Sequence, residues 1–189
     1  KLANLIAANN NHNLKNVYFC GNSGSEACEA SLYLSYHYHL INGNPQKNVF
    51  ISRKQSYHGM TLNSLSLGDR PNLDIFNKLL PKNRFKISMH HPLNNKKSKE
   101  SETDYGIRCA KELENKILQI GPDRVAAFVG ETIMGGLVGD VPPTHNYWRE
   151  IKKICIKYNI HLILDECYCG TGTTGKYFCC DWDKVEPDI

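Results

Sequence analysis

The chain has 189 residues, of which 41% are hydrophobic and 22% are charged, and its formal net charge is +4. This composition is ordinary for a globular protein, and the length suffices for one good-sized core or a large part of a bigger domain. The basic residues are scattered, apart from Lys96-Lys97-Ser98-Lys99, which indicates a solvated loop; no nucleic-acid-binding face is therefore expected. No apolar run reaches the length of a membrane span and no signal peptide is visible, which predicts a cytoplasmic protein without membrane contact.

The cysteines are expected to be reduced thiols, because several of the eight lie in apolar or helical patterns where a free thiol acts as a small buried hydrophobe. A zinc site built from Cys167, Cys169, Cys179 and Cys180 is conceivable. However, the cysteines of a structural zinc pair are usually separated by about two to four residues. Neither of these pairs has that spacing. We therefore predict that the chain holds no metal.

The first part of the chain predicts a strand that runs into the start of a long helix. Residues 1–13 are expected to hold the tail of a helix and an Asn-rich loop, and Val17–Cys20 a short strand, before a helix over 26–40. At this junction Gly24 would let the backbone approach a phosphate, and Ser25 would add a hydroxyl. Free N–H groups and the helix dipole make such a junction an anion site. The alternative is a plain helix cap with acidic residues in the first turn.

A second strand is predicted over 48–52, and Tyr57-His58-Gly59 follows it. An aromatic ring at a strand exit can present a flat face to a ligand. The alternative is a tyrosine packed within its loop. Residues 63–103 are rich in turn-forming residues and predict a long, partly irregular segment over the surface.

The second half alternates helices with buried strands. An amphipathic helix is predicted over 104–120, a strand over 125–129 that leads to Glu131, a helix over 146–158, and a strand over 162–164. This order predicts an α/β fold with a mostly parallel sheet flanked by helices.

The last predicted strand ends in Asp165 and Glu166. Ligands of open parallel sheets bind outside the carboxyl ends of the strands, and a buried carboxylate there needs a partner. Such a carboxylate either pairs with a positive group on a ligand or stabilises a loop through hydrogen bonds. The stretch 170–175 fits G-x-G-x-x-G, but a dinucleotide fingerprint should open a helix directly after the strand. No helical period follows here, so a tight glycine turn is predicted instead.

These features together suit one ligand, pyridoxal 5'-phosphate. The anion site at Gly24 and Ser25 would hold its phosphate, and Tyr57 would offer a face to its ring. A carboxylate at Asp165 would keep the pyridine nitrogen protonated, which makes the ring an electron sink for a carbanion.

The sequence resembles the class III pyridoxal-phosphate aminotransferases of fold type I. The matching stretches are NSGSEACEA (22–30), QSYHG (55–59), RVAAFVGE (124–131), PP…Y (142–147), LILDECYCGTGTTGKYF (162–178) and the final PDI. The resemblance implies that residues 1–189 are a single partial domain, part of the large cofactor-binding domain. It also implies that the cofactor is contacted by residues of every matching loop, namely Gly24, Ser25, Tyr57, His58, Glu131, Asp165 and Cys167.

The resemblance further implies a homodimer with the active site at the subunit interface. The implied reaction moves an amino group from an amino donor, with an ω-amino acid as the preferred candidate, to a keto acid such as pyruvate. The alternatives are an aminomutase or decarboxylase of the same family, or a cofactor-binding remnant without catalysis. In the family the Schiff-base lysine lies just beyond the Pro-Asp-Ile that ends this chain. We therefore expect the chain to be cut at both ends and, as given, to be inactive and to lack the C-terminal small domain.

Three positions depart from the family pattern. Cys167 stands where the family usually has a valine packed on the ring, and Thr173 stands where it has an arginine. Thr132 replaces the proline of the family's Glu-Pro pair. These changes leave open an altered specificity.

Overall fold

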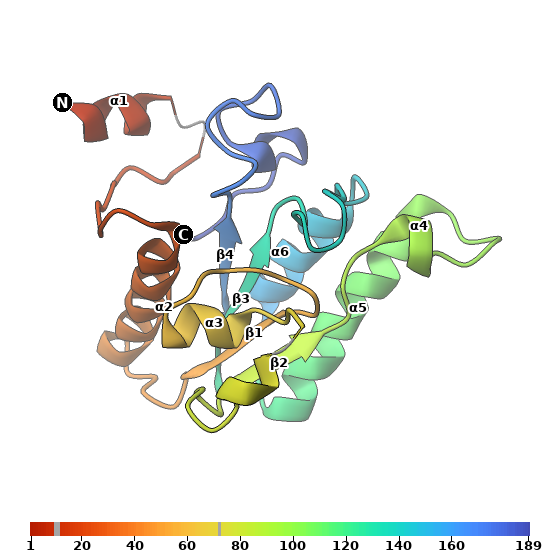
Figure 1. The fold of residues 1–189 in the computed structure, drawn as a ribbon, viewed down its shortest axis with the longest axis horizontal. Helices are drawn as coiled ribbons and strands as arrows, with labels where there is room; N and C mark the ends of the chain where they lie inside the picture. The colour runs from red at the N-terminus through yellow and green to blue at the C-terminus, as the bar shows by residue number, and fades with distance from the viewer. Residues whose placement is uncertain (10–11, 72) are drawn as a thin grey trace.

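The fold is built on a parallel sheet. The computed structural model describes residues 1–9, 12–71 and 73–189. In this part of the chain four strands form one sheet in the order β2-β1-β3-β4, and every neighbouring pair is parallel (Figure 1). The strands are β1 (Val49–Arg53), β2 (Arg84–Ile87), β3 (Val125–Glu131) and β4 (His161–Asp165). The predicted α/β class with a parallel sheet is confirmed.

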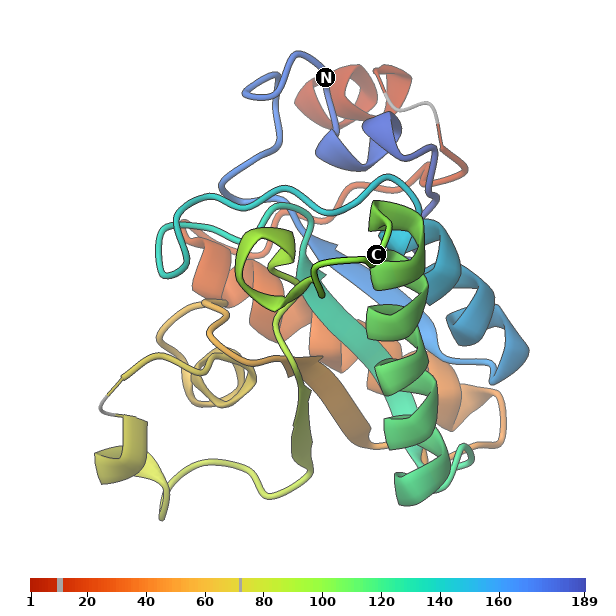
Figure 2. The same ribbon diagram turned by 90° about the vertical axis from the view of Figure 1, so that its right-hand side faces the viewer.

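Helices cover both faces of this sheet. Those described are α1 (Leu2–Ala8), α2 (Gly24–Ile41), α3 (Leu62–Leu67), α4 (Pro92–Asn95), α5 (Glu102–Ile120) and α6 (Tyr147–Lys157), with 3-10 turns at Leu73–Phe76 and Cys179–Trp182. Helices α5 and α6 pack on one face, and α2 and α3 pack on the other (Figures 1 and 2). None of the described helices is long and apolar enough to cross a membrane.

The two faces of the strands explain this layering. Val49 and Ile51 of β1 join the core formed with α5 and α6, whereas Phe50 between them joins the core with α2 and α3. Successive side chains of a strand point to opposite faces, so a strand covered on both sides must be apolar throughout. All five residues of β1 and the first six of β3 are buried. This is why these strands could be read from continuous apolar runs.

Two predictions about the first hundred residues are wrong. Residues 17–20 form no strand and pair with no strand of the described chain, and Tyr18 and Phe19 are exposed. Residues 63–103 are not merely an irregular segment, because β2 lies within them and forms the edge of the sheet. In β2 the charged residues Arg84 and Lys86 flank Phe85, so the strand lacks the continuous apolar run from which the buried strands were predicted. The Asn-rich loop expected after α1 includes residues 10 and 11, which lie outside the described residues.

The sheet brings the ends of several elements to one edge. Glu131 ends β3 and Asp165 ends β4, and the two are register partners across the strands. Residues 57–59 follow the exit of β1, and helix α2 begins with Gly24 at the same edge (Figure 1). The predicted site residues are therefore brought together by the topology.

Candidate cofactor-binding site

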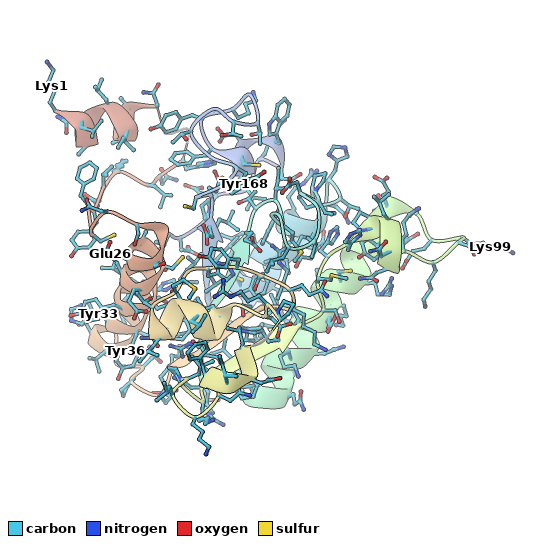
Figure 3. All side chains as sticks on the ribbon, viewed as in Figure 1. Lys1, Glu26, Tyr33, Tyr36, Lys99 and Tyr168 are labelled. Atoms are coloured by element: carbon cyan, nitrogen blue, oxygen red, sulfur yellow. The ribbon has the colours of Figure 1, made fainter. Side chains whose placement is uncertain are left out.

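A cavity of about 650 Å³ opens at the carboxyl edge of the sheet. It is lined by all the residues that the sequence predicted for the cofactor, namely Gly24, Ser25, Tyr57, His58, Glu131, Asp165 and Cys167. Arg70 and Tyr168 are among the lining residues that sequence reasoning missed. Figure 3 shows Tyr168 above the carboxyl end of the sheet. Tyr168 follows the exit of β4 by three residues, a position that could have pointed to it, whereas Arg70 follows no strand exit and is placed here by the fold.

Asp165 is held by three hydrogen bonds. Its Oδ2 atom lies 2.8 Å from His58 Nδ1 and accepts the Cys28 thiol at 3.4 Å, and its Oδ1 atom accepts the Cys167 N–H at 3.1 Å. Burial opposes ionisation of this carboxyl, but the hydrogen bond and charge of His58, with the other two donors, lower the pKa of Asp165 below its ordinary value. Asp165 is therefore a carboxylate that can hold a proton donor of a ligand.

His58 fixes the orientation of that carboxylate. Because Asp165 accepts, Nδ1 of His58 carries the proton, and the tautomer follows from this hydrogen-bond network. The ring is buried, and its Nε2 atom has no hydrogen-bond partner among the described residues. A buried polar atom without a partner is costly. This atom remains available to a bound ligand or to an ordered water.

Helix α2 begins at the cavity. Its cap is Ser23, whose Oγ accepts the Glu26 N–H at 3.3 Å, so the plain N-cap exists. The next two residues, Gly24 and Ser25, line the cavity in the first turn, where helical N–H groups have no intrahelical acceptor. A Cβ at Gly24 would lie only 2.8 Å from Cys167 Sγ. Glycine therefore permits the helix to approach the loop after β4.

The Ser25 hydroxyl ties the two loops of the cavity together. Its Oγ accepts the N–H of Met60, in the segment after Tyr57, at 3.0 Å. A Cβ at Gly59 would lie 2.5 Å from the same Oγ, and Gly59 has a φ of 127° that favours glycine. The helix start and the Tyr-His-Gly loop are consequently in van der Waals contact.

Tyr57 faces the cavity rather than the interior of its loop. Its side chain is 44% exposed, which does not fit a packed loop tyrosine. The guanidinium carbon of Arg70 lies 5.5 Å from the centre of its ring, a cation–π contact. This contact holds the ring while leaving part of it open.

Glu131 and Cys167 complete the wall. Oε1 of Glu131 accepts the Gly135 N–H at 3.3 Å, while Oε2 has no partner among the described residues. Burial raises the pKa of Glu131, and burial with the nearby Asp165 raises the pKa of the Cys167 thiol. Cys167 is therefore neutral at pH 7 and contacts the helix start through its sulfur.

The neighbouring Glu166 braces a loop. Its two oxygens accept the N–H of Cys179 at 2.7 Å, the N–H of Cys180 at 2.8 Å and the hydroxyl of Thr132 at 2.9 Å. Of the two alternatives raised by the sequence, Glu166 takes the one in which a carboxylate holds a loop. Asp165 faces the cavity, and Glu166 holds the loop. Thr132, which replaces a proline of the family pattern, supplies one of these hydrogen bonds.

The fold and this site define the class of protein. The chain has a parallel α/β sheet flanked by helices, and its structural neighbours are transaminases of fold type I. Residues 1–189 match the family described as aminotransferase class-III. The chain belongs to the class III aminotransferases.

The relatives place the chain within longer proteins. It is 38% identical to an aminotransferase of Schizosaccharomyces pombe and 37% identical to gamma aminobutyrate transaminase 2 of Solanum lycopersicum. Both matches cover 100% of this chain, but 41% and 40% of the relatives. The chain therefore spans about two fifths of the curated relatives it matches.

Solved structures are similar over almost the whole chain. A transaminase with L-alanine is 35% identical, with a TM-score of 0.91, over 99% of this chain and 43% of its own. An ω-aminotransferase from Paracoccus denitrificans is 32% identical, with a TM-score of 0.90, over 99% of this chain and 41% of its own. The family resemblance read from the sequence is confirmed.

Proposed function

We propose that the whole protein is a pyridoxal-phosphate-dependent transaminase and that this chain supplies the phosphate and ring contacts. The observation that carries the proposal is the Asp165 carboxylate, kept ionised at the cavity by His58, Cys167 and Cys28. A carboxylate in this position suits a ligand that must hold a proton on a ring nitrogen. The start of α2 at the same cavity suits a phosphate.

The residues present fit this cofactor. The cavity of about 650 Å³ falls in the range of small-molecule sites, roughly 300 to 1000 Å³. His58 leaves a buried Nε2 atom unpartnered among the described residues, as expected where a ligand or its water completes the hydrogen bonds. Tyr57 offers a partly exposed ring on the same wall as Gly24 and Ser25.

When bound, pyridoxal phosphate supplies an electron sink for the carbanion left when the substrate loses a proton. Asp165 holds the proton of the ring nitrogen, and His58 and Cys28 fix the carboxylate for this task. Gly24 and Ser25 bind the phosphate through backbone N–H groups and a hydroxyl. Tyr57 packs on the ring and excludes water from it. Cys167 borders the same space with a smaller side chain than the valine of the family pattern.

The family's catalytic lysine is proposed to follow Ile189. The backbone already runs beside β4 at this end, because Asp188 N–H donates to Leu162 O at 2.8 Å and Leu164 N–H donates to Ile189 O at 3.1 Å. From the first bond to the second, the residue numbers rise on both segments, as they do in a parallel pair of strands. A continuing chain would therefore run parallel to β4. It would then reach the carboxyl edge of the sheet next to Asp165. The chain is accordingly proposed to be one partial domain of the longer protein.

The substrates and the dimer are also proposals. Names of the relatives include gamma-aminobutyrate transaminase, diaminobutyrate–2-oxoglutarate transaminase and putrescine–pyruvate aminotransferase, which favours a terminal amine as donor and a keto acid such as pyruvate as acceptor. Exposed apolar side chains gather on α2 and the segment before it: Tyr18, Phe19, Tyr33, Tyr38 and Ile41. Tyr33 points away from the sheet (Figure 3). Such a patch suits coverage by the rest of the protein and by a second copy in a homodimer. The cytoplasmic location stays a prediction.

The test uses the full-length protein with pyridoxal phosphate, a terminal amine and pyruvate. We expect alanine to form in step with loss of the amine, and an Asp165→Asn variant to lose most of this activity. Asp123→Asn is the matched control, because Asp123 is an exposed acid just before β3, at the amino edge of the sheet and away from the cavity. Consumption of the amine without pyruvate, or release of carbon dioxide, would show a different chemistry of the same family.

A further inference from the structure

Two buried thiols lie together at the base of the loop that follows β4. Cys169 is 2% exposed and Cys179 is 5% exposed. Their sulfur atoms and a carboxylate oxygen of Glu166 all lie within 4.8 Å of one another. All eight cysteines of the chain are free in this structure. The pair has no part in the cofactor contacts described above.

The loop between them is closed by Glu166. Its backbone carbonyl accepts the Gly170 N–H at 2.8 Å, which turns the chain directly after Cys169. Its side chain accepts the Cys179 N–H at 2.7 Å, which fixes the other end. The two cysteines are thus held on facing ends of one closed loop, near the top of the molecule in Figure 1.

The intervening segment can open without disturbing the sheet. Residues 171–173, 175 and 176 are exposed, and Thr171, Gly172 and Gly175 have positive φ angles typical of tight turns. An exposed loop outside the sheet costs less free energy to open than the whole domain costs to unfold. The proposal below requires such an opening, because both thiols are covered in the closed form.

The chemistry of the pair favours reaction with each other. A hydrogen bond between the two sulfurs lowers the pKa of Cys179, which favours a thiolate within the pair. A thiolate is the nucleophile in thiol–disulfide exchange. Because the two sulfurs lie within 4.8 Å of each other, either thiol has the other beside it as the resolving thiol.

A metal ion is the other occupant that two thiols could suggest. It would need a third protein donor, and Glu166 is the nearest. Both carboxylate oxygens of Glu166 already accept hydrogen bonds, from Cys179, Cys180 and Thr132. Two sulfurs alone are too few ligands for a structural zinc site, which takes about four. The geometry favours a bond between the sulfurs.

We propose that Cys169 and Cys179 are a reversible disulfide pair, which a small disulfide oxidant of the glutathione class closes and a thiol reductant opens. One of the two cysteines attacks glutathione disulfide as its thiolate and releases one glutathione. The thiolate of the other then attacks the mixed disulfide and releases the second. The two protein thiols lose two protons and two electrons, and glutathione disulfide takes them up. The bond would staple the loop next to Tyr168 and Cys167, which line the cavity.

The positions of the lysines make the bond directly measurable. Trypsin cuts after Lys157, Lys176 and Lys184, so it places Cys169 in a peptide of residues 158–176 and Cys179 in a peptide of residues 177–184. We expect full-length protein equilibrated with glutathione disulfide, then blocked with an alkylating agent and digested, to yield these two peptides joined. Prior reduction should separate them.

Each peptide carries a second cysteine that serves as its matched control. The joined product should persist in Cys167→Ser and in Cys180→Ser, and it should vanish in Cys169→Ser and in Cys179→Ser. Fragmentation of the wild-type product identifies the bonded residues without any variant. The proposal is overturned if no joined peptides form, if the bond runs through Cys167 or Cys180, or if the purified protein holds a stoichiometric metal that Cys169→Ser loses. None of these readouts depends on transaminase activity, so the result stands apart from the proposed function.

Discussion

Replacement of Asp165 by Asn is the most informative change, because it removes the charge of the carboxylate and keeps its shape. The amide oxygen of Asn can still accept the hydrogen bonds that Oδ2 of Asp165 takes from His58 and Cys28, whereas its NH2 group cannot accept the Cys167 N–H that Oδ1 accepts. Asn cannot hold a proton on a bound pyridine nitrogen by charge. The variant therefore separates the electrostatic role of the residue from its packing.

The expected magnitude follows from the position of the carboxylate. An opposite charge at hydrogen-bond distance raises the pKa of a cationic group by about one to three units, and each unit corresponds to about 1.36 kcal/mol. Without that charge the pKa of the ring nitrogen falls by about one to three units, and its protonated fraction at neutral pH falls about 10- to 1000-fold. We expect turnover to fall about 10- to 1000-fold, which is the same one to three units expressed as a rate.

The assay should follow one half-reaction. The full-length variant is mixed with excess amine, and the loss of the cofactor's absorbance is recorded as a single turnover, next to the Asp123→Asn control. Cofactor affinity is measured separately, so that weak binding is not mistaken for slow chemistry. The smallest expected effect, one pKa unit, corresponds to a tenfold loss of rate. A rate within about threefold of wild type at saturating cofactor would therefore refute the assignment of Asp165 to the ring nitrogen.

Three other changes test the remaining contacts. Tyr57→Ala should weaken cofactor binding about tenfold, the equivalent of an aromatic stacking contact near 1.4 kcal/mol, whereas Tyr57→Phe, which keeps the ring, should leave the dissociation constant nearly unchanged. Gly24→Ala should destabilise the fold by about 1 to 3 kcal/mol in urea unfolding, because its Cβ would lie 2.8 Å from Cys167 Sγ. Adding Cys167→Ala should restore much of this free energy of unfolding. If the double variant stays as unstable as Gly24→Ala, the contact with Cys167 is not the cause. Hydrogen bonds from Lys111, Lys157 and Tyr158 lower the pKa of Glu114 to about 2. Its contribution to the free energy of unfolding is therefore present above the ordinary carboxyl pKa of 4.5 and is lost as the pH falls toward 2. Glu114→Gln should therefore cost about 1 kcal/mol at pH 7 and almost nothing near pH 2, a difference that urea titrations at both pH values would reveal.

The sheet could be predicted where burial leaves a simple signature. Strands β1, β3 and β4 are covered on both faces, so their sequences are continuous apolar runs that end in polar residues. Strand β2 is at the edge, and its Lys86 amine reaches Ser66 O and Leu67 O through a long aliphatic stem. That lysine resembles a surface residue in the sequence. Residues 17–20 show the opposite error, because an apolar composition favours a strand only if a partner strand is available.

The site could be predicted as a set of loops, but not as a set of contacts. The topology alone guarantees that the ends of β3 and β4 meet at one edge. The donors that hold Asp165 lie far away in sequence: Cys28 is 137 residues from it and His58 is 107 residues from it. No local pattern connects such positions. Cys28 in particular looks like one more apolar residue of a helix until the fold places its thiol on the carboxylate.

Asp165 and Glu166 are adjacent in the sequence, but their side chains point to opposite sides and have different roles. As β4 ends, the register of a strand sends successive side chains to opposite sides. Asp165 meets His58 and the cavity, while Glu166 meets the N–H groups of Cys179 and Cys180. Glu166 is absent from the lining of this cavity, and its three hydrogen bonds hold the loop. Asp165 also accepts three hydrogen bonds, from His58, Cys28 and the Cys167 N–H, but it lines the cavity, where its oxygens can accept a further donor. The chemistry proposed for Asp165 therefore depends on Glu166 fixing the loop behind it, and a shift of one residue in β4 would exchange the two roles.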